Sequence, residues 1–135
     1  MNDAFSNIFQ TLLPGANAGM ELVDPDDIQQ GMKIKIAFNN AWKDTLSETS
    51  GGQRSLLALS FVLSLLKYRP APLYILDEID AALDLQHTQN IGKMIKTHFP
   101  ESQFLIISLK EGMFRNANVL YKIEFSDNKS KVTRY

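Results

Sequence analysis

The spacing of apolar residues in the first third of the chain predicts one helix and one strand. Apolar side chains recur three and four positions apart between residues 3 and 12, which predicts a short helix that ends before Pro14. Residues 15–31 are rich in Gly, Asn, Asp and Pro, and predict a loop with some extended structure. Apolar and polar positions alternate over residues 32–38, as in a strand with one wet face. Residues 41–50 predict a polar connection that contains the single tryptophan.

The rest of the chain predicts helices that alternate with short apolar strands. The predicted elements are, in chain order, a helix over 52–67, a buried strand over 73–76, a helix over 85–98, a buried strand over 104–107, and hairpin strands over 119–125 and 131–135. Short apolar runs that are separated by a helix are typical of parallel strands buried on both faces. The order of elements therefore predicts an α/β sandwich.

Composition narrows the class of protein. The chain has 135 residues, of which 44% are apolar and 21% charged, with a formal net charge of -1. This size fits one domain or a large fragment of one, and the balanced charge makes no global case for nucleic-acid binding. The chain lacks cysteine, which excludes disulfides and thiolate metal sites. The longest apolar-rich run, residues 56–66, is well short of the roughly 20 residues that span a bilayer, so we expect a soluble intracellular domain.

The first candidate site stands at the start of the helix over 52–67. Its residues are Ser50, Gly51, Gly52 and Gln53. Free N–H groups at a helix N-terminus favour anions, and glycines let the backbone approach a phosphate closely. Taken alone, this segment is better explained as an N-cap with a flexible loop before it.

The second candidate site is the pair of acids that ends the strand over 73–76. Ligands of α/β sheets bind at the carboxyl ends of strands, where Asp77 could hold Mg²⁺ and Glu78 could polarise an attacking water. The plain alternative is an acidic pair that begins a loop.

The two segments together resemble the C-terminal lobe of ABC ATPases. In this resemblance residues 50–53 match the signature motif, 73–77 match the Walker B strand with Glu78 in the catalytic-glutamate place, and 82–84 match the D-loop. Residues 53–56, 77–84 and 108–111 look like the structural maintenance of chromosomes (SMC) branch of this superfamily, which often carries serine at the switch position, here Ser108, where transporters usually carry histidine. Within the SMC family, residues 11–18 and 108–118 look most like the second SMC subunit of condensin.

The resemblance implies a fold, a set of ligands and a set of residue roles. The implied fold is the C-terminal lobe of an ATPase head, with a mostly parallel sheet flanked by helices and a C-terminal hairpin. The implied cofactors are ATP and Mg²⁺, with Mg²⁺ held by Asp77 and water activated by Glu78 in this head. The residues implied to contact nucleotide are Ser50, Gly51, Gly52 and Gln53 toward the γ-phosphate of a partner head, Asp84 near the head–head contact, and Ser108 as a switch that positions water or senses the γ-phosphate.

The resemblance also implies partners and a location. They are the N-terminal lobe of the same protein, a second SMC head, a kleisin subunit, and DNA through the full complex, with no membrane. The implied location is the nucleus or chromosome and the cytoplasm, and the implied activity is ATP hydrolysis coupled to chromosome condensation.

A P-loop motif, G-x-x-x-x-G-K-[ST], is absent from this sequence. A helix N-terminus contributes at most about 2 kcal/mol to holding an anion, whereas millimolar affinity requires roughly 4 kcal/mol. We therefore expect the chain to be inactive alone. The resemblance implies that residues 1–135 are a single head lobe, with 1–13 as a remnant near the coiled-coil junction. A sheet completed by another lobe would leave an edge and an apolar face exposed.

Two other functions remain open from the sequence. One is the head lobe of a coiled-coil DNA-repair ATPase, and the other is a catalytically silent interaction module. A departure from the family pattern is Thr49, where the signature motif usually begins with leucine. We expect His87 and His98 to have surface or helix-end roles, and Lys33 and Lys35 to lie on a solvated strand face.

Overall fold

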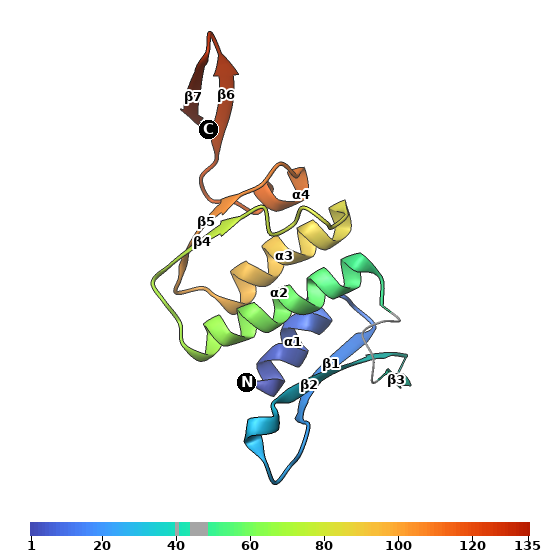
Figure 1. The fold of residues 1–135 in the computed structure, drawn as a ribbon. Coiled ribbons are helices and arrows are strands. Elements are labelled where there is room, and N and C mark those ends of the chain that lie inside the picture. Colours follow the sequence, from blue (N-terminus) through green and yellow to red (C-terminus); the bar gives the residue numbers. More distant parts are fainter. Residues whose placement is uncertain (40, 44–48) are drawn as a thin grey trace.

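The computed structural model of the protein describes residues 1–39, 41–43 and 49–135, and it combines helices with three small sheets (Figure 1). The helical elements are α1 (Asn2–Leu12), the 3-10 turn η1 (Ile28–Gln30), α2 (Gly51–Tyr68), α3 (Leu85–His98) and α4 (Glu111–Phe114). The strands are β1 (Ala16–Leu22), β2 (Met32–Phe38), β3 (Ala41–Lys43), β4 (Leu73–Asp77), β5 (Gln103–Ile107), β6 (Tyr121–Ser126) and β7 (Lys129–Arg134). Every predicted helix and strand is present, with ends shifted by at most two residues.

The strands β1 and β3, the 3-10 turn η1 and the short helix α4 were not predicted as separate elements. The loop with some extended structure that was predicted over 15–31 contains β1, whose bounds its sequence ANAGMEL does not show because it is poor in strand-forming residues. Antiparallel pairing with β2, from Ala16↔Phe38 to Leu22↔Met32, makes this segment a strand. The polar connection predicted over 41–50 is wrong for residues 41–43, which form β3 and pair with β2. Residues 44–48 of the predicted connection lie outside the described part of the chain. The short helix α4 has too few residues to show a periodic pattern.

The α/β class is confirmed, but the detail of a mostly parallel sheet is wrong for this chain. Among the described strands only β4 and β5 pair in parallel, whereas β1–β2–β3 and β6–β7 are antiparallel. Consecutive strands that a short turn connects pair antiparallel, because a parallel pair requires a long crossover. Here only α3 supplies such a crossover, between β4 and β5.

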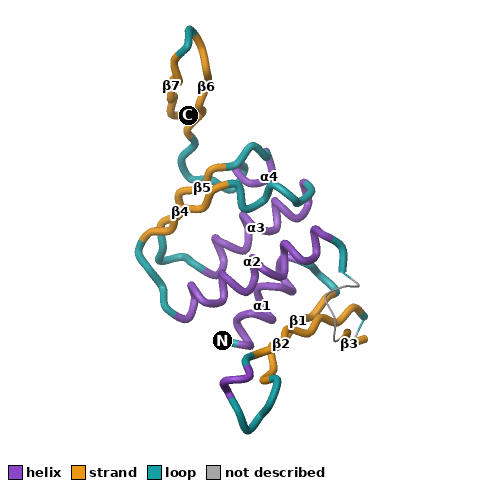
Figure 2. The backbone as a smooth tube through the Cα atoms, viewed as in Figure 1, coloured by secondary structure: helices purple, strands orange, loops and turns teal. Residues whose placement is uncertain are grey.

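The core lies where α1, α2 and α3 meet (Figure 2, purple). Each apolar residue that predicted α1 is fully buried in it: Phe5, Ile8, Phe9 and Leu12. The helix α2 contributes Leu56 and Leu63 to the same core, and α3 contributes Ile91 and Met94. None of the helices in the described ranges is both long and apolar enough to cross a bilayer.

The β4–β5 pair is covered on one face only. On the covered face, the rings of Tyr74 and Phe104 lie 4.9 Å apart between centroids, beside Phe99. The open face carries apolar side chains that are 47–64% exposed, namely Leu73, Ile75, Leu105 and Ile107. The prediction that both strands are buried is therefore wrong, whereas the exposed apolar face expected from the resemblance is present. The hairpin β6–β7 projects away from the rest of the chain (Figure 1).

Candidate functional site

The start of α2 is a capping box formed by two of the predicted site residues. The backbone N–H of Gln53 donates to Ser50 Oγ at 3.2 Å, and the Gln53 side-chain oxygen accepts from the backbone N–H of Ser50 at 3.0 Å. The predicted N-cap role of Ser50 is confirmed. A capping box satisfies two of the N–H groups that a helix N-terminus leaves without intrahelical partners.

Glycine at position 51 is not explained by the chain's own packing. A Cβ added there would have no atom within 4 Å, and its backbone does not have a positive φ. At Gly52 an added Cβ would lie 3.8 Å from the Ala82 carbonyl oxygen, which is an ordinary contact. The N-terminus of α2 is thus exposed at Gly51. At Gly52 it lies beside the loop that follows β4.

The acids Asp77 and Glu78 are exposed at the carboxyl end of β4. Glu78 has a φ of 45°, in the left-handed region that costs a non-glycine residue about 1–3 kcal/mol and that occurs often at functional sites. Its backbone N–H donates to the carbonyl of Ile107 at 2.9 Å, beyond the last residue pair of β4 and β5. This bond turns the chain sharply at Glu78 and ties the acids to the end of β5.

The loop after Glu78 is tied to the residue that follows β5. Ser108 Oγ donates to Asp80 Oδ2 at 2.6 Å and accepts from the Lys110 backbone N–H at 2.9 Å. Asp80 is 2% exposed, so its carboxylate is a buried polar group satisfied by this hydroxyl. Ser108, the predicted switch residue, is therefore connected to the loop that leads from Glu78 to the predicted D-loop.

Asp84 caps α3. Its Oδ1 accepts from the His87 backbone N–H at 2.9 Å and lies 2.8 Å from His87 Nδ1. The backbone hydrogen bond from His87 is the main reason that the pKa of Asp84 lies below its ordinary value, with the nearby imidazole adding to it. This contact confirms the helix-end role predicted for His87.

The structure brings some predicted site residues together and leaves others apart. Glu78 is bonded to Ile107, the residue before Ser108, and Gly52 lies beside the predicted D-loop at Ala82. In the described part of the chain, no hydrogen bond or ion pair joins Asp77 or Glu78 to residues 50–53. Residues 1–39, 41–43 and 49–135 also contain no group of three or more His, Cys, Asp or Glu side chains that could hold a metal ion.

Lys110 is a site residue that sequence reasoning missed. Its ammonium donates to backbone carbonyls of the loop between Asp80 and Leu83. The only signal in the sequence was its position two residues after Ser108, and the pattern of the chain does not show where a lysine ammonium points.

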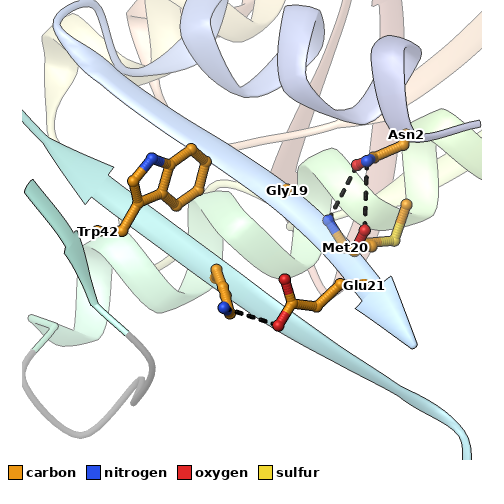
Figure 3. Close-up of a pocket in the computed structure, with 6 residues that line it drawn as sticks. Asn2, Gly19, Met20, Glu21 and Trp42 are labelled. Atoms are coloured by element: carbon orange, nitrogen blue, oxygen red, sulfur yellow. Dashed lines mark hydrogen bonds and ion pairs between the residues drawn. The ribbon is translucent and has the colours of Figure 1, made fainter. Parts of the chain in front are cut away.

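A pocket lies away from these residues, between the N-terminus of α1 and the sheet β1–β2–β3 (Figure 3). It has a volume of about 400 Å³ and is lined by Asn2, Gly19, Met20, Glu21, Lys35 and Trp42. Its polar groups are paired: Asn2 bonds the Met20 backbone at 2.9 and 3.2 Å, and Glu21 forms ion pairs of 2.7 Å with Lys33 and with Lys35. The two lysines therefore lie on a solvated, paired face, as predicted.

Comparisons with known proteins point to one family. The RecF/RecN/SMC N terminal domain family model matches residues 20–132. "Structural maintenance of chromosomes protein 2" of Homo sapiens is 58% identical over 135 residues, and the chain spans 11% of that protein's length.

Solved structures agree with this match. The chain superposes with a TM-score of 0.87 and 36% identity on an SMC head bound to the C-winged helix domain of ScpA, covering 99% of this chain and 41% of that one. A structure from work on ATP-driven dimerization and DNA-stimulated activation of SMC ATPases gives a TM-score of 0.88 and 35% identity, covering 99% of this chain and 82% of that one.

Proposed function

Because the chain belongs to the RecF/RecN/SMC family, we propose that it is the C-terminal lobe of an SMC ATPase head and that residues 1–135 form this single lobe, with 1–13 adjoining a coiled coil. In this role it supplies the signature motif, the Walker B acids and the D-loop to ATP hydrolysis that two heads perform together. The observation that carries the proposal is the pair of carboxylates at the carboxyl end of the parallel strand β4, beside Ser108. Ligands of α/β sheets bind at this end of the strands.

The two acids suit two different tasks. Mg²⁺ binds through one or two carboxylates and retains waters and phosphate oxygens, so the single exposed carboxylate of Asp77 fits it in the presence of a nucleotide. Glu78 follows a sharp turn of the backbone at φ 45°, so its side chain leaves the strand in another direction. An exposed carboxylate in this place is suited to take a proton from an attacking water.

The open N-terminus of α2 fits a phosphate that comes from outside the chain. Gly51 has free space beside its Cα, and a larger residue at this position would fill the space that a phosphate needs. The capping box holds the Ser50 and Gln53 side chains at the same place. We assign Ser50, Gly51, Gly52 and Gln53 to the γ-phosphate bound by the partner head.

The remaining residues of the site act around the transferred phosphate. Asp84 belongs to the contact between heads, because it is exposed at the start of α3. Ser108 belongs beside the attacking water, because its hydroxyl is anchored to Asp80, two residues after Glu78. Bound ATP would supply the phosphoanhydride that breaks, and bound Mg²⁺ would offset the charge that develops on its oxygens.

The proposed partners follow from surfaces of the chain and from its relatives. The open face of β4–β5 is contiguous and apolar, which is typical of a surface that another domain covers, here the N-terminal lobe that carries the P-loop. An SMC head related to this chain was solved with the C-winged helix domain of ScpA, so a kleisin subunit is a further proposed partner. A second SMC head and DNA complete the set.

The similarity to SMC protein 2 supports a proposed role in chromosome condensation. We propose that the intact protein is a condensin subunit that binds ATP, acts on chromosomes, and couples head engagement to DNA compaction.

The test is ATP hydrolysis by a complete head. The chain is joined by a short linker to a matching N-terminal lobe with a P-loop, and turnover is measured with a partner head that supplies its signature motif but whose own catalytic glutamate is replaced. Glu78→Gln is expected to lower kcat by at least about 100-fold, since a positioned general base contributes about 10²–10⁴-fold. ATP-dependent pairing of the heads is expected to persist, because the amide keeps the size of the side chain.

Glu101→Gln is the matched control, because Glu101 is an exposed acid in the turn after α3. Turnover that does not change in Glu78→Gln, or an intact pair without turnover, would contradict the proposal and favour a silent interaction module.

A further inference from the structure

The ammonium of Lys110 is enclosed by the backbone of the loop that follows Glu78. Lys110 Nζ donates to the carbonyl oxygen of Asp80 at 2.7 Å and of Ala81 at 2.8 Å, and also to that of Leu83. An ammonium has three N–H donors, and these three carbonyls use all of them. The acceptors come from a stretch of only four residues, so the loop wraps around one positive charge.

This arrangement makes the loop conformation depend on the cation. The carbonyls of Asp80, Ala81 and Leu83 converge on one point, and without a positive charge their negative ends would repel one another. Within the loop, the backbone bonds are Ala81 N–H to the Glu78 carbonyl at 3.1 Å and Leu83 N–H to the Asp80 carbonyl at 3.0 Å. Hydrogen bonds from a charged donor are roughly twice as strong as such neutral bonds, so Lys110 is the main anchor of the loop.

Lys110 also orients the hydroxyl of Ser108. Its backbone N–H donates to Ser108 Oγ at 2.9 Å, which occupies a lone pair of that oxygen. The Ser108 hydroxyl proton is then directed to Asp80 Oδ2, 2.6 Å away. One residue therefore holds the loop by its side chain and the switch serine by its backbone.

The position of Lys110 is itself fixed by close packing two residues later. A Cβ added at Gly112 would lie 3.0 Å from the Leu85 carbonyl oxygen and 3.1 Å from Thr88 Cβ. The start of α4 is thus pressed against the start of α3, directly after Asp84, and Thr88 is fully buried there. The lysine and the loop that it holds are fastened to the same helix.

We propose that Lys110 is a positioning residue for ATP hydrolysis: it clamps the loop between Glu78 and Asp84, and so sets the direction of these two carboxylates. The inference rests on the proposed function, since it concerns the same site. It assigns to this lysine a role that does not require contact with nucleotide.

The clamp also predicts that the shape of the donor matters as well as its charge. A planar guanidinium fork suits bidentate acceptors, whereas the ammonium of lysine is a compact point with three donors.

The experiment uses the full-length protein in complex with its partner head. Three variants are compared: Lys110→Met, which keeps the apolar stem, Lys110→Arg, which keeps the charge, and the control Lys96→Met. Lys96 is exposed on α3, outside the site. The two measurements are hydrogen exchange of residues 79–84, with α2 as an internal reference, and steady-state ATP hydrolysis.

In Lys110→Met we expect exchange in residues 79–84 to rise by about tenfold while exchange in α2 stays unchanged, because the loop opens locally. We expect kcat to fall by about 10- to 100-fold, as for a misplaced reacting group, while KM for ATP changes by less than about twofold. Lys110→Arg is expected to resemble Lys110→Met, and Lys96→Met to resemble the wild type.

Several results would overturn the clamp. They are unchanged exchange in residues 79–84, acceleration that is uniform across the chain, and full rescue by arginine, which would show that charge alone suffices. Faster exchange with the kcat of the control would confine Lys110 to a structural role and overturn the positioning proposal. A wild-type complex that does not hydrolyse ATP would instead refute the proposed function, and hydrogen exchange would still decide whether the clamp exists.

Discussion

Phe9 and Ile75 are large apolar residues in two regions of the molecule that differ in how far they bury such side chains. Phe9 on α1 is 0% exposed in a core shared with α2 and α3, whereas Ile75 on β4 is 64% exposed on an open sheet face. Both are strongly hydrophobic, and full burial of either side chain stabilises by about 1.5–3 kcal/mol. The chain thus completes one apolar core and leaves another apolar surface uncovered.

The residues that stabilise the fold and the residues of the candidate site lie in different regions. The helical core contains none of the predicted site residues, while Asp77 and Ser108 stand at the ends of the two strands with the open face. The helix α2 belongs to both regions, because Leu56 and Leu63 are buried whereas Ser50 is exposed. The candidate site is therefore anchored to the core through α2 and the covered face of the sheet.

The largest expected effect tests the complete core. Phe9→Ala is expected to lower the free energy of unfolding by about 3–5 kcal/mol, because it removes a fully buried ring and leaves a cavity. Ile75→Ala, on the open face, is expected to change it by less than about 0.5 kcal/mol. Urea unfolding of the 135-residue chain, followed by circular dichroism, measures both. Equal losses from the two variants would show that β4 is covered in solution.

The same pair of variants sharpens the comparison when the N-terminal lobe is joined to the chain. Ile75→Ala should then become destabilising while the effect of Phe9→Ala stays the same, because only the open face gains a cover.

A medium effect is expected at the point where α2 links the two regions. Ser50→Ala removes the N-cap and half of the capping box, and should lower the free energy of unfolding by about 1 kcal/mol. Ser130→Ala, at an exposed position of β7, is the control and should have almost no effect. A Ser50→Ala variant that is as stable as the control would mean that the N-terminus of α2 is frayed.

The smallest effect is a pH dependence at the C-terminal end of α3. Burial, and then the charge of Lys67 at 3.2 Å, hold the pKa of His98 below its ordinary value of 6.5. The unfolded chain therefore binds this proton more readily, so the stability that neutral His98 contributes is present above pH 6.5 and is lost as the pH falls through the lower folded pKa. Solvent screening limits the effect to less than about 0.5 kcal/mol.

His98→Gln checks this assignment. Unfolding free energies at about pH 7.5 and about pH 5.5 bracket the ordinary histidine pKa. The difference between the two values should be smaller in the variant than in the wild type. An unchanged difference would assign the pH dependence to other groups, such as Asp84 or Glu21, although their lowered pKa values act in a more acidic range.

Local patterns in the sequence were sufficient to predict most helices and strands and part of the candidate site. The periodicity of α1 predicted its buried face residue by residue, and Ser50 was recognisable as an N-cap from its place before a helix. The bounds of β1, within a segment predicted to have only some extended structure, were not predictable because its Ala, Asn and Gly residues carry little strand preference. Its pairing with β2, which begins ten residues after β1 ends, decides them. Lys110 escaped because a flexible side chain shows no periodicity.

The chain's own residues were enough to establish where helices and strands form, which acids end β4, and which family pattern the motifs follow, since these depend on local spacing and side-chain type. Tertiary structure alone decided which strands pair in parallel, which face of β4–β5 stays open, and how Lys110 and Ser108 hold the loop beside Glu78. The reason is physical: these features depend on contacts between residues about 30 positions apart in the sequence, such as Asp80 and Lys110. Such contacts form only when several elements pack at once, because their gain must exceed the entropy of closing the intervening chain.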